Sequence, residues 1–214
     1  MASGAVFQVG EQKIRPGVYV RVTSSGETAV GAVPQGIVAA LFRSSWGPLG
    51  KPVVLENASA VPFMFGDDGT VDVILEAFRG GCRQVVAYRQ GTGGSKATLN
   101  LQNGESVNVV KMEAKYEGKR GNNFAVTVRD SLTDETKREL LLFEGATLRQ
   151  TVKFDKGAGE PDALVEALKD SPWVVATKLT GEGSLASTTQ QPLTGGEDPT
   201  VTGEDYSAGL SAIV

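Results

Sequence analysis

The pattern of apolar and polar positions predicts alternating strands and helices in the first part of the chain. An unbroken apolar run over residues 37–42 predicts a strand that is buried on both faces. From Val71 to Phe78, apolar residues recur with the spacing of one helix face, and two glycines follow that end the helix. Residues 84–89 predict another strand, so this stretch is expected to form a βαβ unit.

Shorter elements are predicted around this unit. Val18 and Val20 alternate with larger or polar neighbours, which indicates a strand, and residues 53–55 indicate a further short strand. Ser59 is a candidate cap for a brief helix, with Pro62 in the first turn, where a missing N–H does little harm.

A change in composition begins at the glycine-rich residues 91–95, which are the best candidate for a boundary. Beyond them the chain alternates in the manner of strands, with one short helix beginning at Pro161. The polar, small residues 181–191 predict a loop. The predicted strands cover residues 98–101, 107–114, 124–128, 139–143, 147–154 and 173–179.

The last segment predicts an amphipathic helix. Thr202 and Asp205 stand three residues apart, as in a capping box. Tyr206, Leu210 and Ile213 then lie on one helix face. Little else at this end of the sequence offers that face something to pack against.

Composition narrows the classes of function. The chain has 214 residues, 40% of them hydrophobic, which is the balance of a globular protein. A formal net charge of −4, with no run of Lys and Arg longer than two, disfavours nucleic-acid binding through a basic face. The apolar stretches are too short for a secretory signal or for a membrane-spanning helix, so we expect no nucleic acid as partner and no membrane insertion.

The candidate chemistry is sparse. Histidine is absent, which excludes Ser-His-Asp and Cys-His catalysis within these residues and removes the commonest metal ligand. Cys82 is the single cysteine, so no internal disulfide can form. Its place at a helix-to-strand corner beside Arg83 leaves a reactive thiol open, although a small buried corner residue is the favoured interpretation. We predict a protein that is not an enzyme and needs no cofactor or metal.

Two further motifs have alternative interpretations. Residues 118–121, Gly-Lys-Arg-Gly, suit an anion, but the P-loop order is missing and a turn before a strand is favoured. Asp67 with Asp68, and Asp134 with Glu135, could form catalytic carboxylate pairs, but they lie in turn-like sequence and are expected to be solvated.

Trp46 and Trp173 are the two tryptophans of the chain. Either could stack on a sugar. Core or rim packing is favoured for both, because aromatic side chains dominate core burial.

Short motifs, many of them containing glycine, follow one another in a fixed order from about residue 14 to residue 210. They are Arg15-Pro16-Gly17-Val18-Tyr19-Val20, then residues 36–42, Ser45-Trp46-Gly47-Pro48-Leu49-Gly50, residues 77–83 before 85–89, residues 116–123 before 124–126, residues 192–198, and Asp205-Tyr206 with Leu210. In order and spacing these motifs resemble the N-terminal half of contractile tail sheath proteins of bacteriophages and related injection particles.

The resemblance implies an α+β fold, with a partial mixed α/β core and an inserted β-rich domain. The expected division is an N-terminal arm over residues 1–13, part of the core over 14–90, the insert over 95–191, and the truncated start of a C-terminal core segment over 192–214. In this family, terminal arms exchange strands with neighbouring subunits. The candidate interface residues are therefore Val6, Phe7, Val9 and Ile14, and a disordered terminus is the alternative.

The resemblance also implies a structural function. The protein is expected to polymerise around a tail tube and to contract, with other copies of itself, the tube protein and the baseplate as partners. Its expected location is the virion tail, assembled in the bacterial host cytoplasm. The alternative is a surface-exposed binding or adhesin module, which aromatic side chains clustered on one exposed face of residues 95–191 would favour. A further α/β half encoded downstream of Val214 would favour the sheath.

Overall fold

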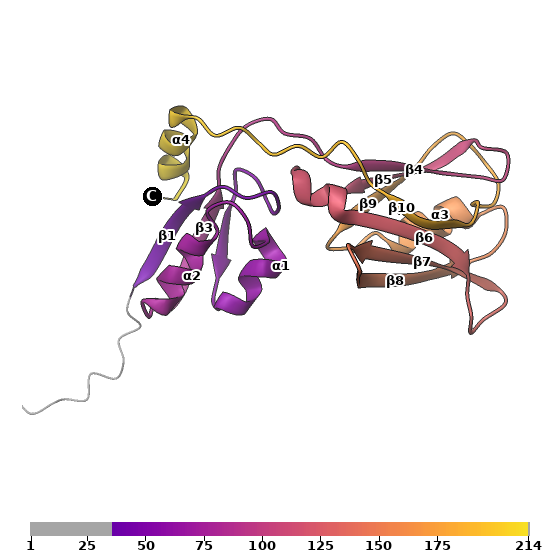
Figure 1. Ribbon diagram of the computed structural model, residues 1–214, viewed down its shortest axis with the longest axis horizontal. Helices are drawn as coiled ribbons and strands as arrows, with labels where there is room; N and C mark the ends of the chain where they lie inside the picture. The colour runs from indigo at the N-terminus through magenta and orange to yellow at the C-terminus, as the bar shows by residue number, and fades with distance from the viewer. Residues whose placement is uncertain (1–35, 214) are drawn as a thin grey trace, which may run out of the picture. The chain divides into compact units, whose positions relative to one another are not determined.

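The βαβ unit predicted over residues 37–89 is present in the computed structural model, which describes residues 36–213 (Figure 1). Strand β1 (Ile37–Phe42) pairs in parallel with β3 (Gln84–Arg89), and helix α2 (Asp72–Arg79) connects them. Strand β2 (Pro52–Leu55) pairs with the other edge of β3 in antiparallel orientation, so the order is β1-β3-β2. The predicted strand at residues 18–20 lies outside the described residues.

One face of this three-stranded sheet is well covered. Helices α1 (Val61–Phe65) and α2 supply apolar side chains that pack on alternate residues of the strands. We call the result the sheet cluster. Its buried members are Ala40, Phe42, Leu55, Val61, Phe65, Val71, Ile74, Val85 and Ala87.

The other face of the sheet is largely open, and the prediction that β1 is buried on both faces is wrong. Ile37 is 69% exposed, and Ala39 on the same face is exposed as well. The physical reason is that helix α4 (Gly203–Ile213) covers this face only near Leu41 and Tyr88, at the other end of the strand.

The helix starts around residue 60 also differ from the prediction. Asn57, and not Ser59, caps the 3₁₀ turn η1 (Ala58–Ala60), because its extended backbone lets Oδ1 accept the Ala60 N–H at 3.0 Å. The Ser59 hydroxyl instead donates to the same oxygen at 2.7 Å.

Helix α4 begins as predicted. Thr202 and Asp205 form the capping box, with the Thr202 N–H donating to Asp205 Oδ2 at 2.6 Å. The packing differs, because Tyr206 and Leu210 are exposed and the buried residue is Gly209. A Cβ at that glycine would lie 2.7 Å from Leu41 Cδ2, so the helix packs through the position without a side chain.

Residues 98–192 contain the strands of two antiparallel sheets that face each other (Figure 1). One sheet has the order β10-β6-β7-β8 and the other β4-β5-β9. The strands are β4 (Thr98–Gln102), β5 (Asn108–Ala114), β6 (Phe124–Asp130), β7 (Lys137–Glu144), β8 (Thr147–Asp155), β9 (Val174–Lys178) and β10 (Thr188–Pro192). With the βαβ unit, these sheets make an α+β fold, as predicted.

Strand β10 lies where the sequence predicted a loop. Its side chains are mostly exposed and polar, so no apolar alternation marks it. It exists because its backbone pairs with β6, with a register irregularity between Thr188 and Gln191. An edge strand of this kind is defined by backbone hydrogen bonds, which hydrophobic periodicity does not report.

The two sheets are closed against each other along both sides. On one side, helix α3 (Glu160–Ala167) packs against β8 and β9. On the other side, backbone bridges join Thr98 to Thr194 and Asn103 to Leu185. Together these form a β-sandwich whose edges are almost all paired or covered.

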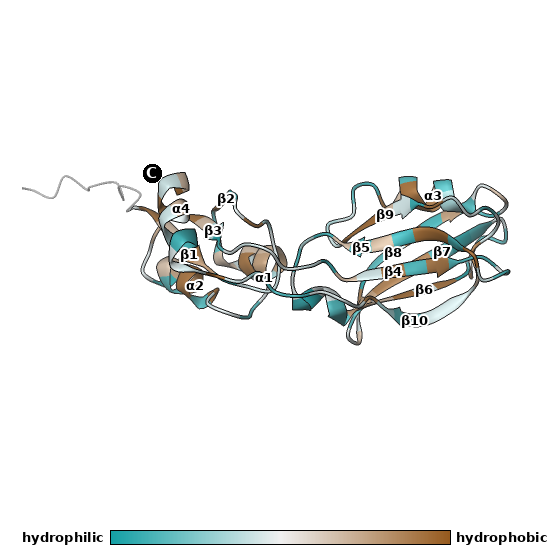
Figure 2. Ribbon diagram, turned by 90° about the horizontal axis from the view of Figure 1, so that it is seen from above, coloured by the Kyte–Doolittle hydropathy of each residue, from teal (hydrophilic) through white to brown (hydrophobic). Residues whose placement is uncertain are grey.

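The apolar residues of the sandwich point inward in strict alternation. Phe124, Val126 and Val128 are fully buried, whereas the residues between them are not. Figure 2 shows the hydrophobic segments along β6 and β7. We call the resulting core the sandwich cluster. Its largest fully buried side chains are Trp46, Phe124, Leu101, Met112, Leu140, Leu142, Leu164 and Leu168.

No helix among the described residues is long and apolar enough to cross a membrane.

Candidate functional site at the junction of the two clusters

Trp46 follows β1 in the chain but packs in the sandwich cluster, and it is only 1% exposed. Its ring lies edge-on to Tyr116 and Phe124, each with a centroid distance of 5.2 Å. Trp173 packs in the same cluster, 6.2 Å from Trp46. The prediction of core packing is therefore confirmed for both tryptophans, and neither ring is free to stack on a sugar.

Arg89 ends strand β3 and is fully buried. Its guanidinium donates to three backbone carbonyls: Nε to Ser44 at 3.0 Å, Nη1 to Gly47 at 2.7 Å and Nη2 to Glu117 at 2.8 Å. Desolvation lowers the pKa of Arg89, against the opposing charges of Glu117, Asp198 and Asp68. An arginine still remains protonated at neutral pH, so a buried cation joins the Trp46 segment to the sandwich.

A second arginine crosses the junction near the surface. Arg120 makes two hydrogen bonds to Glu144, at 2.6 and 3.2 Å, and its Nη1 donates to the Pro62 carbonyl at 3.1 Å. Arg149 also donates to Glu144, at 2.7 Å. The Arg120 guanidinium lies 5.6 Å from the ring centroids of both Trp46 and Trp173, within the range of cation–π attraction.

The Glu144 carboxylate responds to these neighbours. Burial by itself disfavours its charged form, but the hydrogen bonds and charges of Arg120 and Arg149 outweigh burial and lower the pKa. The carboxylate therefore stays ionised, and keeps both arginines in place, to a lower pH than an ordinary glutamate would.

The Gly-Lys-Arg-Gly motif at residues 118–121 is the predicted turn before a strand. It enters the 3₁₀ helix η2 (Lys119–Asn123), which leads into β6, and the Lys119 N–H donates to Asp198 Oδ1 at 2.8 Å. Gly118 has a φ of +135°, and a Cβ there would lie 1.9 Å from the Ser45 carbonyl oxygen. Only glycine fits at this contact between the β-sandwich and the segment that follows β1, which we assign to the sheet part together with the three-stranded sheet and its helices.

Two antiparallel segments, residues 92–98 and 194–200, connect the clusters, and we call this pair the ribbon. Thr92 pairs with Thr200, Ser95 with Glu197 and Thr98 with Thr194, each pair through two backbone hydrogen bonds of 2.8–3.0 Å. The Asn122 amide binds both backbone groups of Gly196, at 2.8 and 2.9 Å, as a strand neighbour would.

The remaining candidate residues have structural roles. Asp68 accepts the Ser45 N–H at 3.1 Å. Asp134 lies in a turn, where hydrogen bonds from Thr136 lower its pKa. Cys82 is half-buried against the sheet cluster, which fits a corner residue that is less buried than predicted. Within residues 36–213, no three His, Cys, Asp or Glu side chains gather in a way that could hold a metal ion.

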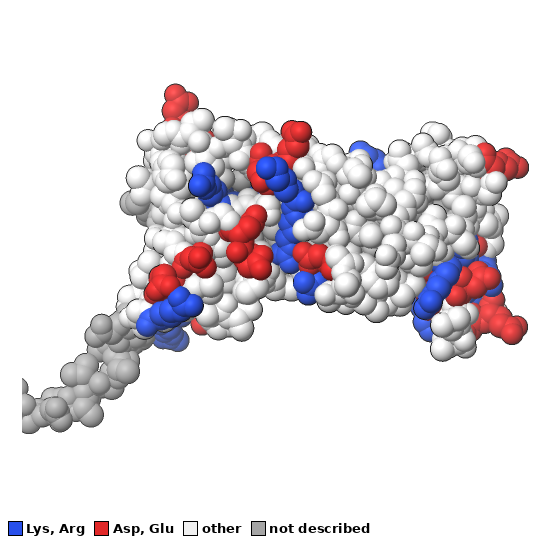
Figure 3. Space-filling view, viewed as in Figure 1, with Lys and Arg blue, Asp and Glu red and all other residues white. Residues whose placement is uncertain are grey.

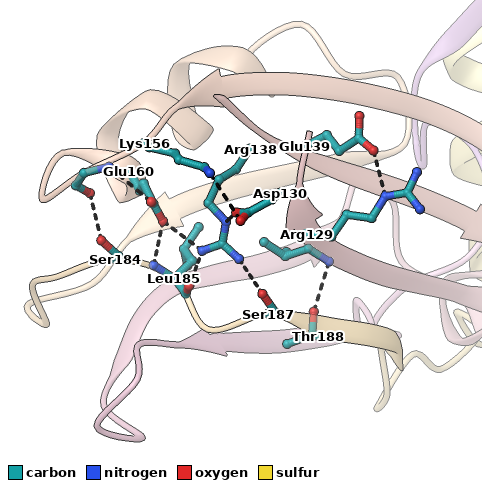
Figure 4. A network of polar contacts seen from close by, with 12 residues as sticks. Arg129, Asp130, Arg138, Glu139, Lys156, Glu160, Ser184, Leu185, Ser187 and Thr188 are labelled. Atoms are coloured by element: carbon teal, nitrogen blue, oxygen red, sulfur yellow. Dashed lines mark hydrogen bonds and ion pairs between the residues drawn. The ribbon is translucent and has the colours of Figure 1, made fainter. Parts of the chain in front are cut away.

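A separate polar network closes the far end of the sandwich (Figure 4). Arg138 and Glu160, both buried, pair at 3.1 Å. Glu160 also accepts the Leu185 N–H at 2.8 Å, and Arg138 donates to the Leu185 carbonyl and to Ser187 Oγ at 2.9 Å. The pair thus fixes the segment that leads into β10 against β7 and α3.

Charged side chains elsewhere on the surface are mixed in sign. On the face seen in Figure 3, Lys and Arg lie beside Asp and Glu around the middle of the described residues and at one end. Exposed pairs such as Lys137 with Asp155 and Lys178 with Asp162 follow this pattern.

The contacts at the junction hold segments of the chain together, and the sequence analysis did not predict them. Among the described residues the junction brings together buried aromatic rings and arginines that bind carbonyls. Arg89 was predicted only as the end of a strand. The sequence signal for its burial was its position directly after the apolar residues of that strand. The predicted interface residues Val6, Phe7, Val9 and Ile14 lie outside the described residues.

Comparison with known proteins identifies the family. Residues 92–198, half of the chain, match the model of the phage tail sheath protein beta-sandwich domain. The matched range begins and ends in the ribbon and contains the whole β-sandwich.

Individual proteins are also similar to this chain. The uncharacterized protein YqbK of Bacillus subtilis (strain 168) is 28% identical over 221 residues, covering 98% of this chain and 46% of YqbK. The sheath tail protein DSY3957 from Desulfitobacterium hafniense superposes with a TM-score of 0.67 at 25% identity, over 92% of this chain and 43% of that protein.

The sheath tail protein Lin1278 from Listeria innocua has the same fold, with a TM-score of 0.68 at 24% identity, over 83% of this chain and 38% of that protein. The chain thus spans less than half the length of each of these three proteins. The resemblance noted in the sequence is confirmed at the level of the family: this chain belongs to the phage tail sheath proteins.

Proposed function

We propose that the chain is part of a structural subunit of a contractile tail sheath, in a phage or a phage-like particle. The observation that carries the proposal is the match of the sandwich, residues 92–198, to the sheath family model. The likeness of the described fold to a sheath tail protein at 25% identity supports it. The subunit has a structural role and is not an enzyme.

In this proposal the subunit assembles with copies of itself around the tail tube and contracts when the baseplate releases it. The subunits would pack against one another in two ways that differ in free energy, and the change from the less stable to the more stable packing would drive contraction. The location is the virion tail, after assembly in the bacterial host cytoplasm.

The proposed division follows the predicted ranges: an arm at 1–13, core at 14–90, insert at 95–191 and further core from 192. Val6, Phe7, Val9 and Ile14 belong to the arm and its junction with the core, and would add a strand to a neighbouring subunit. Strand addition provides backbone hydrogen bonds that hold subunits in series.

The alternative function, a binding or adhesin module, lacks the feature that would favour it. None of the aromatic side chains within residues 95–191 is exposed: Phe124, Phe154 and Trp173 are buried, and Tyr116 and Phe143 are half-buried.

Immunogold electron microscopy of particles released by the source strain tests the proposal. Antibodies raised against the 214-residue chain are expected to label the tail along its shaft, in extended and in shortened tails. Label confined to the tail tip or to fibres would favour the adhesin, and a shaft without label would contradict the proposal. Antibody absorbed with the purified chain is the control.

A further inference from the structure

We propose that Trp46 and Arg89 hold the β-sandwich and the three-stranded sheet together as one rigid body. In this arrangement the two parts unfold in a single cooperative event and do not pivot about the ribbon. The inference concerns residues 36–213 alone and does not depend on the proposed role in a tail.

The ribbon by itself is poorly suited to fix an orientation. Within it, Gly93 and Gly195 have positive φ values of +72° and +86°, with open space where a Cβ would lie, and glycine has the greatest backbone freedom of any residue. An isolated two-stranded ribbon is also marginally stable in water. The rigidity must therefore come from contacts beside the ribbon.

Trp46 supplies the apolar contact. It leaves the sheet part on the segment after β1 and ends among Tyr116, Phe124 and Trp173 in the sandwich. Any rotation of one part against the other would draw this ring out of the sandwich cluster. Such a movement would expose the tryptophan and leave a cavity in a closely packed core.

Arg89 supplies the polar contact and fixes the Trp46 segment. Two of its acceptors, the carbonyls of Ser44 and Gly47, flank Trp46, and the third, Glu117, belongs to the sandwich. Separation of the parts would break the bond from Arg89 Nη2 to the Glu117 carbonyl. A hydrogen bond from a charged donor contributes more to stability than one between neutral groups.

Further contacts oppose the same movement. The Gly118 backbone lies against the Ser45 carbonyl with no room for a Cβ. Arg120 donates to Pro62, and Phe63 lies edge-on to Trp173 at 4.9 Å. These contacts come from two separate segments of the sheet part, one at Ser45 and one at Pro62 and Phe63, and each opposes a movement of the parts.

Hydrogen exchange measured by mass spectrometry, over a series of urea concentrations, tests the inference on the 214-residue chain. In the wild type, peptides from β3 and peptides from β6 and β7 are expected to lose protection at the same urea concentration. In Arg89→Met, the β3 peptides are expected to lose protection first, while the sandwich stays protected, because the sandwich alone is closed on its edges.

Arg138→Met is the matched control. It also replaces a buried arginine that binds a backbone carbonyl, but every partner of Arg138 lies within the sandwich. This variant is expected to lower the urea midpoint of both groups of peptides together, without separating them.

Two results would overturn the inference. One is a wild type in which β3 and β6–β7 lose protection at different urea concentrations. The other is an Arg89→Met variant whose two groups of peptides remain coincident, as in Arg138→Met. Should Arg89→Met fail to fold, Arg89→Lys takes its place, because it keeps the charge but loses the fork that reaches three carbonyls; the same separation is then expected in milder form.

Discussion

The β-sandwich and the three-stranded sheet differ in how completely their own elements cover them. The sandwich buries the inner faces of both its sheets in one cluster, and α3 and the bridges to Thr194 and Leu185 close its sides. The sheet is covered on one face by α1 and α2, while Ile37 and Val54 stay exposed on the other. A part that closes on itself can be stable alone, whereas a half-covered sheet gains stability from what it contacts.

The difference gives the junction its importance. Trp46 belongs to the segment after β1 but is buried in the sandwich cluster, so this contact stabilises the sheet part. Arg89 adds a hydrogen bond from the sheet part to the Glu117 carbonyl. Variants at the junction should therefore affect stability more than similar variants at exposed positions of either part.

Trp46→Ala should have the largest effect. Loss of a buried tryptophan leaves a cavity, and we expect the free energy of unfolding to fall by about 3–5 kcal/mol, measured by urea denaturation and circular dichroism. Phe63→Ala, at an aromatic residue of the same junction that is half exposed, should cost about 1 kcal/mol. Equal losses in the two variants would contradict the assignment of Trp46 as the main contact.

Gly118→Ala should follow, with a loss of about 3 kcal/mol, because the added methyl group meets the Ser45 backbone and the positive φ is strained as well. The control is Gly145→Ala in the β7–β8 turn, where φ is +57° and the space is open. Gly145→Ala should therefore lose only about 1 kcal/mol, which is the cost of a left-handed backbone conformation for a residue with a Cβ. Thermal unfolding of both variants compares the two glycines.

Glu144→Gln should cost about 2 kcal/mol at pH 7, because Arg120 and Arg149 lose a charged acceptor. The pKa of Glu144 is lowered in the folded chain, so its contribution is full above the unfolded value, about 4.3, and is lost as the pH falls through the lower folded value. Urea midpoints between pH 7 and pH 3 should therefore fall less steeply in the variant.

The control for this pH series is Glu166→Gln, whose pair with Lys169 is exposed. It should leave the pH dependence as in the wild type. A Glu144→Gln profile parallel to that of the wild type would show that the lowered pKa does not contribute.

Leu210→Ser should have the smallest effect, within about 0.5 kcal/mol, because this leucine is 54% exposed on α4. The neighbouring change Gly209→Val, which brings a branched side chain against Leu41, should cost more. A large loss in Leu210→Ser would mean that the exposed side of α4 is covered in solution.

Local periodicity was sufficient for the elements that bury a regular face. It predicted β1, α2 and β3, the strands β6 and β7, and the capping box at Thr202. In each of these segments the residues that decide the structure are close together in the sequence, so one sequence carries enough information.

The elements that were missed depend on distant partners. Strand β10 is polar and exists through pairing with β6, and Arg89 is buried because carbonyls from residues 44, 47 and 117 converge on it. Ile37 is exposed because α4 packs at the other end of the strand. The pattern of residues over a short stretch of sequence does not indicate such long-range contacts.

The ribbon has a practical consequence for protein engineering. Thr92 and Thr200 are hydrogen-bonded neighbours, so the polypeptide leaves and returns at almost the same place. A fluorescent protein or another compact unit with adjacent termini could be grafted there, or the intervening residues could be excised and replaced by a tight turn. In an excised variant, Trp46 would have to become polar, since its binding partners would be gone.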